Sequence, residues 1–137
     1  MAHDIILHNY PNSPFSEKVR VAFGIKKLAW RSVIQPVIMP KPDLIPLTGG
    51  YRKIPVMQIG ADIFCDSQII LREIERRHPT PSLSPENKGA PYGLGFWADR
   101  QIFQAAVATH PHCNTLLRYR FRMNYAYLGG LVRRSFC

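Results

Sequence analysis

The sequence has few cysteines, no long hydrophobic run and no acidic residue after Asp99. Its three cysteines, Cys65, Cys113 and Cys137, are too few and too scattered for a disulfide framework or a zinc site. No apolar run approaches the roughly 20 residues of a membrane-spanning helix, and the first residues lack the basic and apolar regions of a secretory signal. These absences predict a cytoplasmic protein with no metal and no membrane segment.

Positive charge is concentrated at the end of the chain. Residues 1–99 carry 12 Lys and Arg against 9 Asp and Glu, a net charge of +3. Residues 100–137 carry 6 Arg and no acidic residue, a net charge of +6. The strong overall basicity therefore describes the last part of the chain, and the first part has the balance of an ordinary globular domain.

Local patterns predict alternating strands and helices in the first part. Four short apolar or β-branched runs have the length of strands: residues 5–7, 30–34, 56–59 and 63–65. Ser13 followed by Pro14 predicts the start of one helix, and Asp66 or Ser67 the start of another. The prolines between residues 36 and 46 exclude a long helix there.

This order of elements predicts an α/β fold in which a βαβ unit is followed by ββα, giving a mixed four-stranded sheet. The predicted domain spans residues 4–84. Residues 85–92, with their proline and glycine, form the predicted linker. A helix over residues 96–108 opens the remaining segment, residues 93–137.

Four short motifs stand in order along the first part of the chain: Ser13-Pro14-Phe15-Ser16, Lys41-Pro42, Arg52-Lys53-Ile54-Pro55-Val56 and Cys65-Asp66-Ser67. Together with the element order, they resemble the N-terminal, thioredoxin-like domain of glutathione S-transferases, in the omega-like and tau-like branch. The resemblance is close over residues 4–84 and loose over residues 93–108. It implies that glutathione is bound as a substrate.

The first motif resembles the turn that faces the glutathione sulfur. The resemblance implies that the Ser13 hydroxyl donates to this sulfur, because the thiolate and not the thiol is the nucleophile. The residues alone leave open that Ser13 is only a helix N-cap, and Ser16 is a nearby rival for the sulfur. Ser13 and Ser16 occupy the two cysteine positions of a glutaredoxin-type turn, which excludes thiol–disulfide exchange there because that reaction needs an attacking sulfur.

The other motifs imply the rest of a glutathione site. A cis bond before Pro55 would turn the backbone of Ile54 toward the cysteinyl backbone of glutathione, although the residues alone favour a trans proline that opens an edge strand. Asp66 and Ser67 would hold the γ-glutamyl end, or would only cap a helix. Lys41 would pair with the glycyl carboxylate, or would be a solvated surface charge.

The function implied by the resemblance is a transferase that conjugates glutathione to small electrophiles, a detoxification activity. In the family a helical second domain shapes the electrophile pocket, and here the matching pattern ends near Thr109. The expectation is therefore a truncated or divergent C-terminal domain, which leaves enzymatic activity open. The alternative is a non-catalytic glutathione-fold binding or interaction module. The electrophile, the stability of the chain and the formation of a homodimer also stay open.

The end of the chain carries weaker signals. Residues 118–122 alternate Arg with aromatic residues, as single-strand nucleic-acid binders do. A single patch of this kind is a weak signal, so nucleic acid is not the expected partner. His110, His112 and Cys113 fit no common zinc spacing. The acid-free composition also suits a shifted reading frame or an unusual exon junction.

Overall fold

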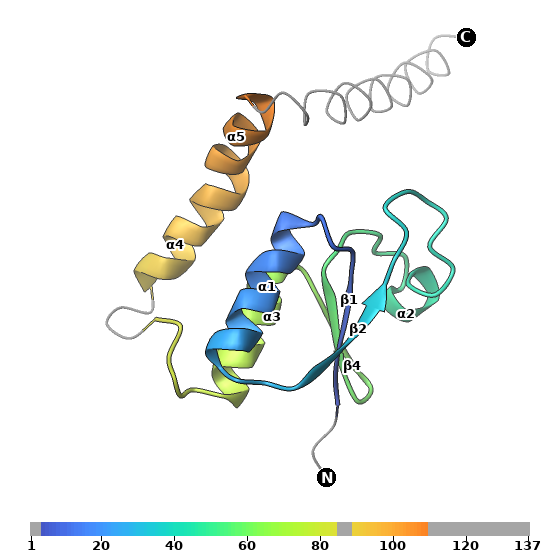
Figure 1. Cartoon of the computed structure of the whole chain (residues 1–137), viewed down its shortest axis with the longest axis horizontal. Helices are drawn as coiled ribbons and strands as arrows, with labels where there is room; N and C mark the ends of the chain where they lie inside the picture. The colour runs from blue at the N-terminus through green and yellow to red at the C-terminus, as the bar shows by residue number, and fades with distance from the viewer. Residues whose placement is uncertain (1–3, 85–88, 110–137) are drawn as a thin grey trace, which may run out of the picture. The chain divides into compact units, whose positions relative to one another are not determined.

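The structure is a computed structural model that describes residues 4–84 and 89–109. Contacts between Cα atoms divide the chain into two units, with the division between residues 88 and 89. The described elements of the first unit follow one another in this order (Figure 1): β1 (Ile5–Asn9), α1 (Pro14–Ile25), β2 (Trp30–Ile34), α2 (Ile45–Thr48), β3 (Val56–Ile59), β4 (Asp62–Cys65) and α3 (Ser67–Arg77).

The four strands form one sheet in the order β2-β1-β3-β4. β1 pairs with β2 in parallel, and the connection between them is α1, which makes the βαβ unit. β3 pairs antiparallel with β1 and with β4. The predicted thioredoxin-like arrangement, βαβ followed by ββα with a mixed four-stranded sheet, is confirmed.

The main core lies between the sheet and the two longer helices. Figure 1 shows α1 and α3 side by side on one face of the sheet and α2 on the other. Because strand side chains alternate between faces, every second residue of β1 and β3 points toward α1 and α3. The core cluster consists of Ile5, Leu7, Val19, Phe23, Met57, Ile59, Ile70 and Ile74.

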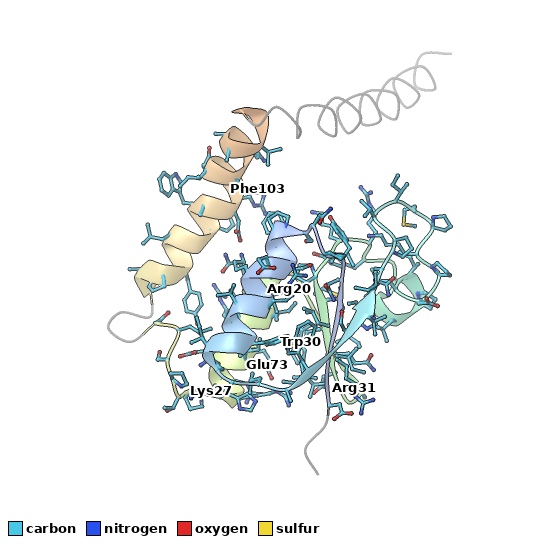
Figure 2. The ribbon with its side chains drawn as sticks, in the orientation of Figure 1. Arg20, Lys27, Trp30, Arg31, Glu73 and Phe103 are labelled. Carbon is cyan, nitrogen blue, oxygen red and sulfur yellow. The ribbon has the colours of Figure 1, made fainter. Side chains whose placement is uncertain are left out.

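Strand β2 shows this alternation at the edge of the sheet (Figure 2). The Trp30 ring lies 5.5 Å from that of Phe23, between the centroids, and extends the core. Its neighbour Arg31 is exposed and forms an ion pair with Asp4, with 2.8 Å between Nη2 and Oδ2. The face of β2 that packs on the core is therefore aromatic at this position, and the opposite face is charged.

Both helix starts lie where the sequence predicts them. Ser13 is the N-cap of α1 and Pro14 its first residue. Asp66 is the N-cap of α3, where its Oδ1 accepts the N–H of Gln68 at 2.8 Å. These local hydrogen bonds satisfy backbone donors that have no partner inside the helix.

The face of the sheet opposite α1 and α3 carries a buried histidine. His8 follows Leu7 on β1 and is 6% exposed. Its Nδ1 lies 3.3 Å from Nε2 of Gln35, which is also buried. Burial lowers the pKa of His8, and this outweighs the opposing effects of the Gln58 side chain and the Asp43 carboxylate. The fold therefore favours the neutral ring.

The stability of the first unit is expected to fall as the pH drops below about 6.5, the pKa of an unfolded histidine. Since the folded pKa is lower, the unfolded chain binds the extra proton first, and the loss levels off below the folded pKa. Urea unfolding of the wild type and of His8→Gln at pH 7.5 and pH 5.5 tests this. The variant should show the smaller change between the two pH values, and an equal change would contradict the role of His8.

The second unit contains a helical run. It consists of α4 (Gly89–Trp97), a π-helical segment η1 (Ala98–Ile102) and α5 (Phe103–Thr109). The helix predicted over residues 96–108 is confirmed, but helix begins at Gly89, within the range predicted as linker. The reason is that Pro91 stands in the first turn, where its missing N–H costs no helical hydrogen bond.

None of the helices within residues 4–84 and 89–109 is long and apolar enough to cross a membrane. The basic and aromatic patch at residues 118–122 and the cluster of His110, His112 and Cys113 lie outside the described residues.

Candidate functional site

The strand register brings three predicted segments to one end of the sheet. His8 pairs with Val56, and Val56 pairs with Cys65, so these residues form a row across β1, β3 and β4. Just beyond this row β1 leads toward Ser13, β3 is preceded by Pro55, and β4 is followed by Asp66. Segments far apart in the sequence therefore leave or enter the strands at the same end of the sheet.

Ser13 is held in a turn at the start of α1. Its N–H donates to the carbonyl of Tyr10 at 3.1 Å, and its Oγ accepts the N–H of Ser16 at 3.2 Å. Capping uses a lone pair of the hydroxyl oxygen and leaves the O–H available as a donor. The residue is 2% exposed. The N-cap role is thus present in the fold, and it is compatible with a donor role.

Ser16 differs from Ser13 in its environment. It is fully buried, and its Oγ has no hydrogen-bond partner within the part of the chain that the structure describes. A buried hydroxyl without a partner costs free energy. Of the two serines in the motif, Ser13 is therefore the one whose oxygen is oriented by a backbone donor.

The peptide bond between Ile54 and Pro55 is cis, as the resemblance predicts. The alternative of a trans proline is wrong. Pro55 is fully buried and Ile54 is half-buried. Because β3 begins at Val56, Ile54 lies outside the strand ladder at the end of the sheet that also leads to Ser13.

Asp66 and Ser67 form the second helix start at this end. Asp66 has φ of +83°, a left-handed conformation that is rare for a non-glycine residue and costs on the order of 1–3 kcal/mol. Such conformations cluster at functional sites. Ser67 is buried as the first residue of α3. The capping alternative is realised by Asp66, whose Oδ1 accepts one backbone N–H.

Lys41 is buried and not a solvated surface charge. It is 5% exposed, and its Nζ donates to the carbonyl of Arg52 at 3.1 Å. Burial, and to a smaller degree the charge of Arg52, lowers the pKa of Lys41. The structure therefore places this ammonium beside the segment that leads to Ile54.

Cys65 lies in this region but is a poor nucleophile. Burial, followed by the charge of Asp66, raises the pKa of the Cys65 thiol. Burial also raises the pKa of Tyr51, with Asp66 and Cys65 adding to the effect. Both groups stay protonated at neutral pH, and the thiolate is the reactive form of a cysteine. Within residues 4–84 and 89–109, no group of three or more His, Cys, Asp or Glu side chains is able to hold a metal ion.

One residue beside the predicted site, Arg20, was missed by the sequence analysis. Arg20 on α1 donates to the Asn9 side chain at the end of β1 and to the Pro11 carbonyl in the turn before Ser13. Arg20 follows Ser13 by seven positions, about two helical turns, so the sequence alone indicates that both lie on the same side of the helix. The partners of Arg20 depend on how β1 meets α1, which the spacing alone does not give.

A family model described as "Glutathione S-transferase, N-terminal domain" matches residues 7–82, more than half of the chain. The chain belongs to the glutathione S-transferase family. The recognition of this family from the four motifs is therefore confirmed. The matched residues run from Leu7, within β1, to just beyond α3, so they include part of β1 and all of the other three strands of the glutathione S-transferase domain.

Known members of the family share this domain. The chain is 26% identical over 102 residues to glutathione S-transferase U4 of Arabidopsis thaliana, covering 72% of this chain and 46% of that protein. A GST-like protein from Pseudomonas syringae superposes with a TM-score of 0.73 at 41% identity, over 98% of this chain and 50% of the other. Rice GST1 in complex with glutathione gives 0.58 at 28% identity, over 72% and 46%. The chain thus spans about half the length of these relatives.

Proposed function

We propose that this glutathione S-transferase domain binds glutathione at the end of the sheet where Ser13, Pro55 and Asp66 meet, and presents its sulfur as a thiolate to small electrophiles. The observation that carries the proposal is this convergence, fixed by the register of β1, β3 and β4. It places two helix N-termini, each preceded by a capping side chain, at one end of the sheet. Helix N-termini favour negative charge.

The proposed role of Ser13 is to donate its O–H to the sulfur. Its oxygen already accepts the Ser16 N–H, so the hydroxyl hydrogen is the group left for a ligand. A free thiol has a pKa of about 8.5. Lowering this pKa by about one unit raises the thiolate fraction at pH 7 several-fold, and lowering it by about two units raises the fraction more than tenfold. The thiolate then forms a bond to the electrophilic carbon, and the leaving group departs with its electron pair.

The peptide parts of glutathione fit the other residues. The backbone of Ile54, outside the ladder, is the proposed partner of the cysteinyl backbone. Asp66 is the proposed acceptor for the γ-glutamyl amine, and Ser67 a donor to its carboxylate. Lys41 uses one hydrogen on the Arg52 carbonyl, and its ammonium has two more for the glycyl carboxylate.

Calorimetric titration with glutathione tests the proposal. The wild type is expected to bind, and Ser67→Ala to weaken binding by about tenfold or more, since a hydrogen bond to a charged group contributes about 1.5–3 kcal/mol. Ser82→Ala is the matched control, because Ser82 is exposed and its hydrogen bonds within the described residues join it to Glu75 and Ser84, away from the proposed site. No binding by the wild type, or an equal loss in both variants, would contradict the site.

Turnover separates an enzyme from a binding module. The full chain is tested for glutathione conjugation by adding an activated chloronitrobenzene to the glutathione-bound protein and following formation of the conjugate by absorbance. Conjugation above the uncatalysed rate supports the transferase, and binding without turnover supports the non-catalytic module.

A further inference from the structure

Arg20 connects three parts of the structure around the Ser13 turn. Its Nη1 donates to Oδ1 of Asn9 at 2.9 Å, at the end of β1, and its Nη2 donates to the carbonyl of Pro11 at 2.8 Å, in the turn. On α1 itself, Nε donates to Oε2 of Glu17 at 2.8 Å, and Nη2 also contacts this oxygen. One guanidinium thus joins the strand, the turn and the helix.

Asn9 transmits this anchoring to the sheet. It is 2% exposed, and its Nδ2 donates to the carbonyl of Leu7 at 3.0 Å and to Oγ of Ser32 at 2.9 Å. Its own carbonyl accepts the N–H of Gln35 at 2.8 Å. Arg20 therefore binds a side chain that is itself fixed to two strands. The guanidinium is rigid and planar, so several bonds at once define the position of the turn.

We propose that Arg20 is a positioning residue that holds the turn before α1 so that the hydroxyl of Ser13 faces the sulfur of glutathione. The inference rests on the proposed function. Arg20 acts through geometry, because its guanidinium donates to the end of the strand and to the turn at the same time. A displacement of about 1 Å at a reacting group is enough to cost a large factor in rate.

Replacing Arg20 leaves the turn held mainly by its own backbone. The bond from Ser13 N–H to the Tyr10 carbonyl and the bond from Ser16 N–H to Ser13 Oγ remain, but both belong to the segment that has lost its anchor. Hydrogen exchange of these two amides therefore reports the turn directly. The peptide covering residues 10–16 should exchange faster in Arg20→Gln and in Arg20→Lys, while peptides from β3 and α3 keep the rate of the wild type.

A thiol placed at residue 13 tests the geometry without glutathione. In a Ser13→Cys background, alkylation by iodoacetamide is followed by mass spectrometry against pH. The pKa of this thiol should lie below about 8.5, because it stands at a helix N-terminus. Adding Arg20→Gln is expected to raise it by about one unit, a fall of several-fold in the alkylation rate at pH 7. Arg20→Lys should raise the thiol pKa by the same amount. Lysine keeps the positive charge, but it lacks the planar guanidinium that bonds to Asn9 and Pro11 together.

Two further variants separate the alternatives. Glu17→Gln keeps the bonds from Arg20 to Asn9 and Pro11, and should leave the thiol pKa within about 0.3 unit of the Ser13→Cys parent. Arg31→Gln is the matched control, since Arg31 forms an exposed ion pair at the opposite end of the sheet, as Figure 2 shows. Rescue by Arg20→Lys would mean that charge acts, and an unchanged pKa in Arg20→Gln would overturn the proposal.

The result with glutathione is separate. In chains that keep Ser13, Arg20→Gln should raise the pKa of bound glutathione, read from thiolate absorbance, and lower the conjugation rate about tenfold with Kd within about threefold. If the wild type binds no glutathione, the proposed function fails while the alkylation experiment still tests Arg20. If glutathione binds and Arg20→Gln changes only the melting temperature, the positioning role fails and the function stands.

Discussion

Ser13→Ala is expected to lower the rate of glutathione conjugation by about 10- to 100-fold, because a hydrogen bond to a thiolate contributes about 1–3 kcal/mol. The affinity for glutathione should change by less than about threefold, since Ile54, Asp66 and Ser67 still hold the peptide ends. The variant also loses the cap of α1, where the Ser13 oxygen accepts the Ser16 N–H. That loss costs about 1 kcal/mol of stability. Steady-state kinetics and urea unfolding measure the two effects.

Two variants separate the two roles of Ser13. Ser13→Thr keeps an oxygen for the cap and a hydroxyl for the sulfur, and should restore most of the stability. Ser16→Ala removes a buried hydroxyl that has no partner among the described residues, so its stability should be unchanged or higher and its rate close to that of the wild type. Normal turnover by Ser13→Ala, or its loss in Ser16→Ala instead, would assign the sulfur contact elsewhere.

Lys26→Met is expected to destabilise the first unit by about 3 kcal/mol, the lower end for breaking a buried ion pair, because it removes the buried partner of a pair whose other member, Glu75, is partly exposed. The Lys26 side chain is 0% exposed, and its Nζ lies 2.6 Å from Oε2 of Glu75. The same ammonium donates to the carbonyls of His78 at 2.5 Å and Pro81 at 2.7 Å. All three hydrogens are therefore used, and they tie the end of α1 to the end of α3 and to the loop after it.

The neighbouring Lys27 provides the control. Lys27 is exposed (Figure 2), so Lys27→Met should change the free energy of unfolding by less than about 0.5 kcal/mol. Combining Lys26→Met with Glu75→Gln should cost less than the sum of the single variants, because no buried charge is left alone. Equal urea midpoints for the Lys26 and Lys27 variants would show that the buried pair contributes little.

The free energy of unfolding at acid pH provides a second test of the Lys26–Glu75 ion pair. Burial raises the pKa of Glu75, but hydrogen bonds from Lys26, Ser82 and the Leu83 N–H lower it by more. A lowered folded pKa adds stability that is present above the unfolded value of about 4.3 and is lost as the pH falls. Since Lys26→Met removes part of this contribution, the difference between variant and wild type should shrink in acid.

The sequence by itself determined the order of elements in the glutathione S-transferase domain. Alternating apolar residues, a Ser-Pro helix start and an Asp-Ser helix start act over a few neighbours, so local composition is enough to predict them. The four motifs also predicted the family. The cis bond before Pro55 came from the family resemblance alone, because the local residues favoured a trans proline. Helix α4 begins earlier than predicted, since a proline is tolerated in a first turn.

The tertiary structure decided which side chains meet. Lysine is usually a surface residue. Lys41 and Lys26 are nevertheless buried, and they contact Arg52 and Glu75, which are distant from them in the sequence. The bonds from Arg20 to Asn9 and Pro11 arise where β1 turns into α1. Partners of this kind depend on sheet register and on the packing of segments distant in the chain, and a pattern read along the sequence contains neither distance nor burial.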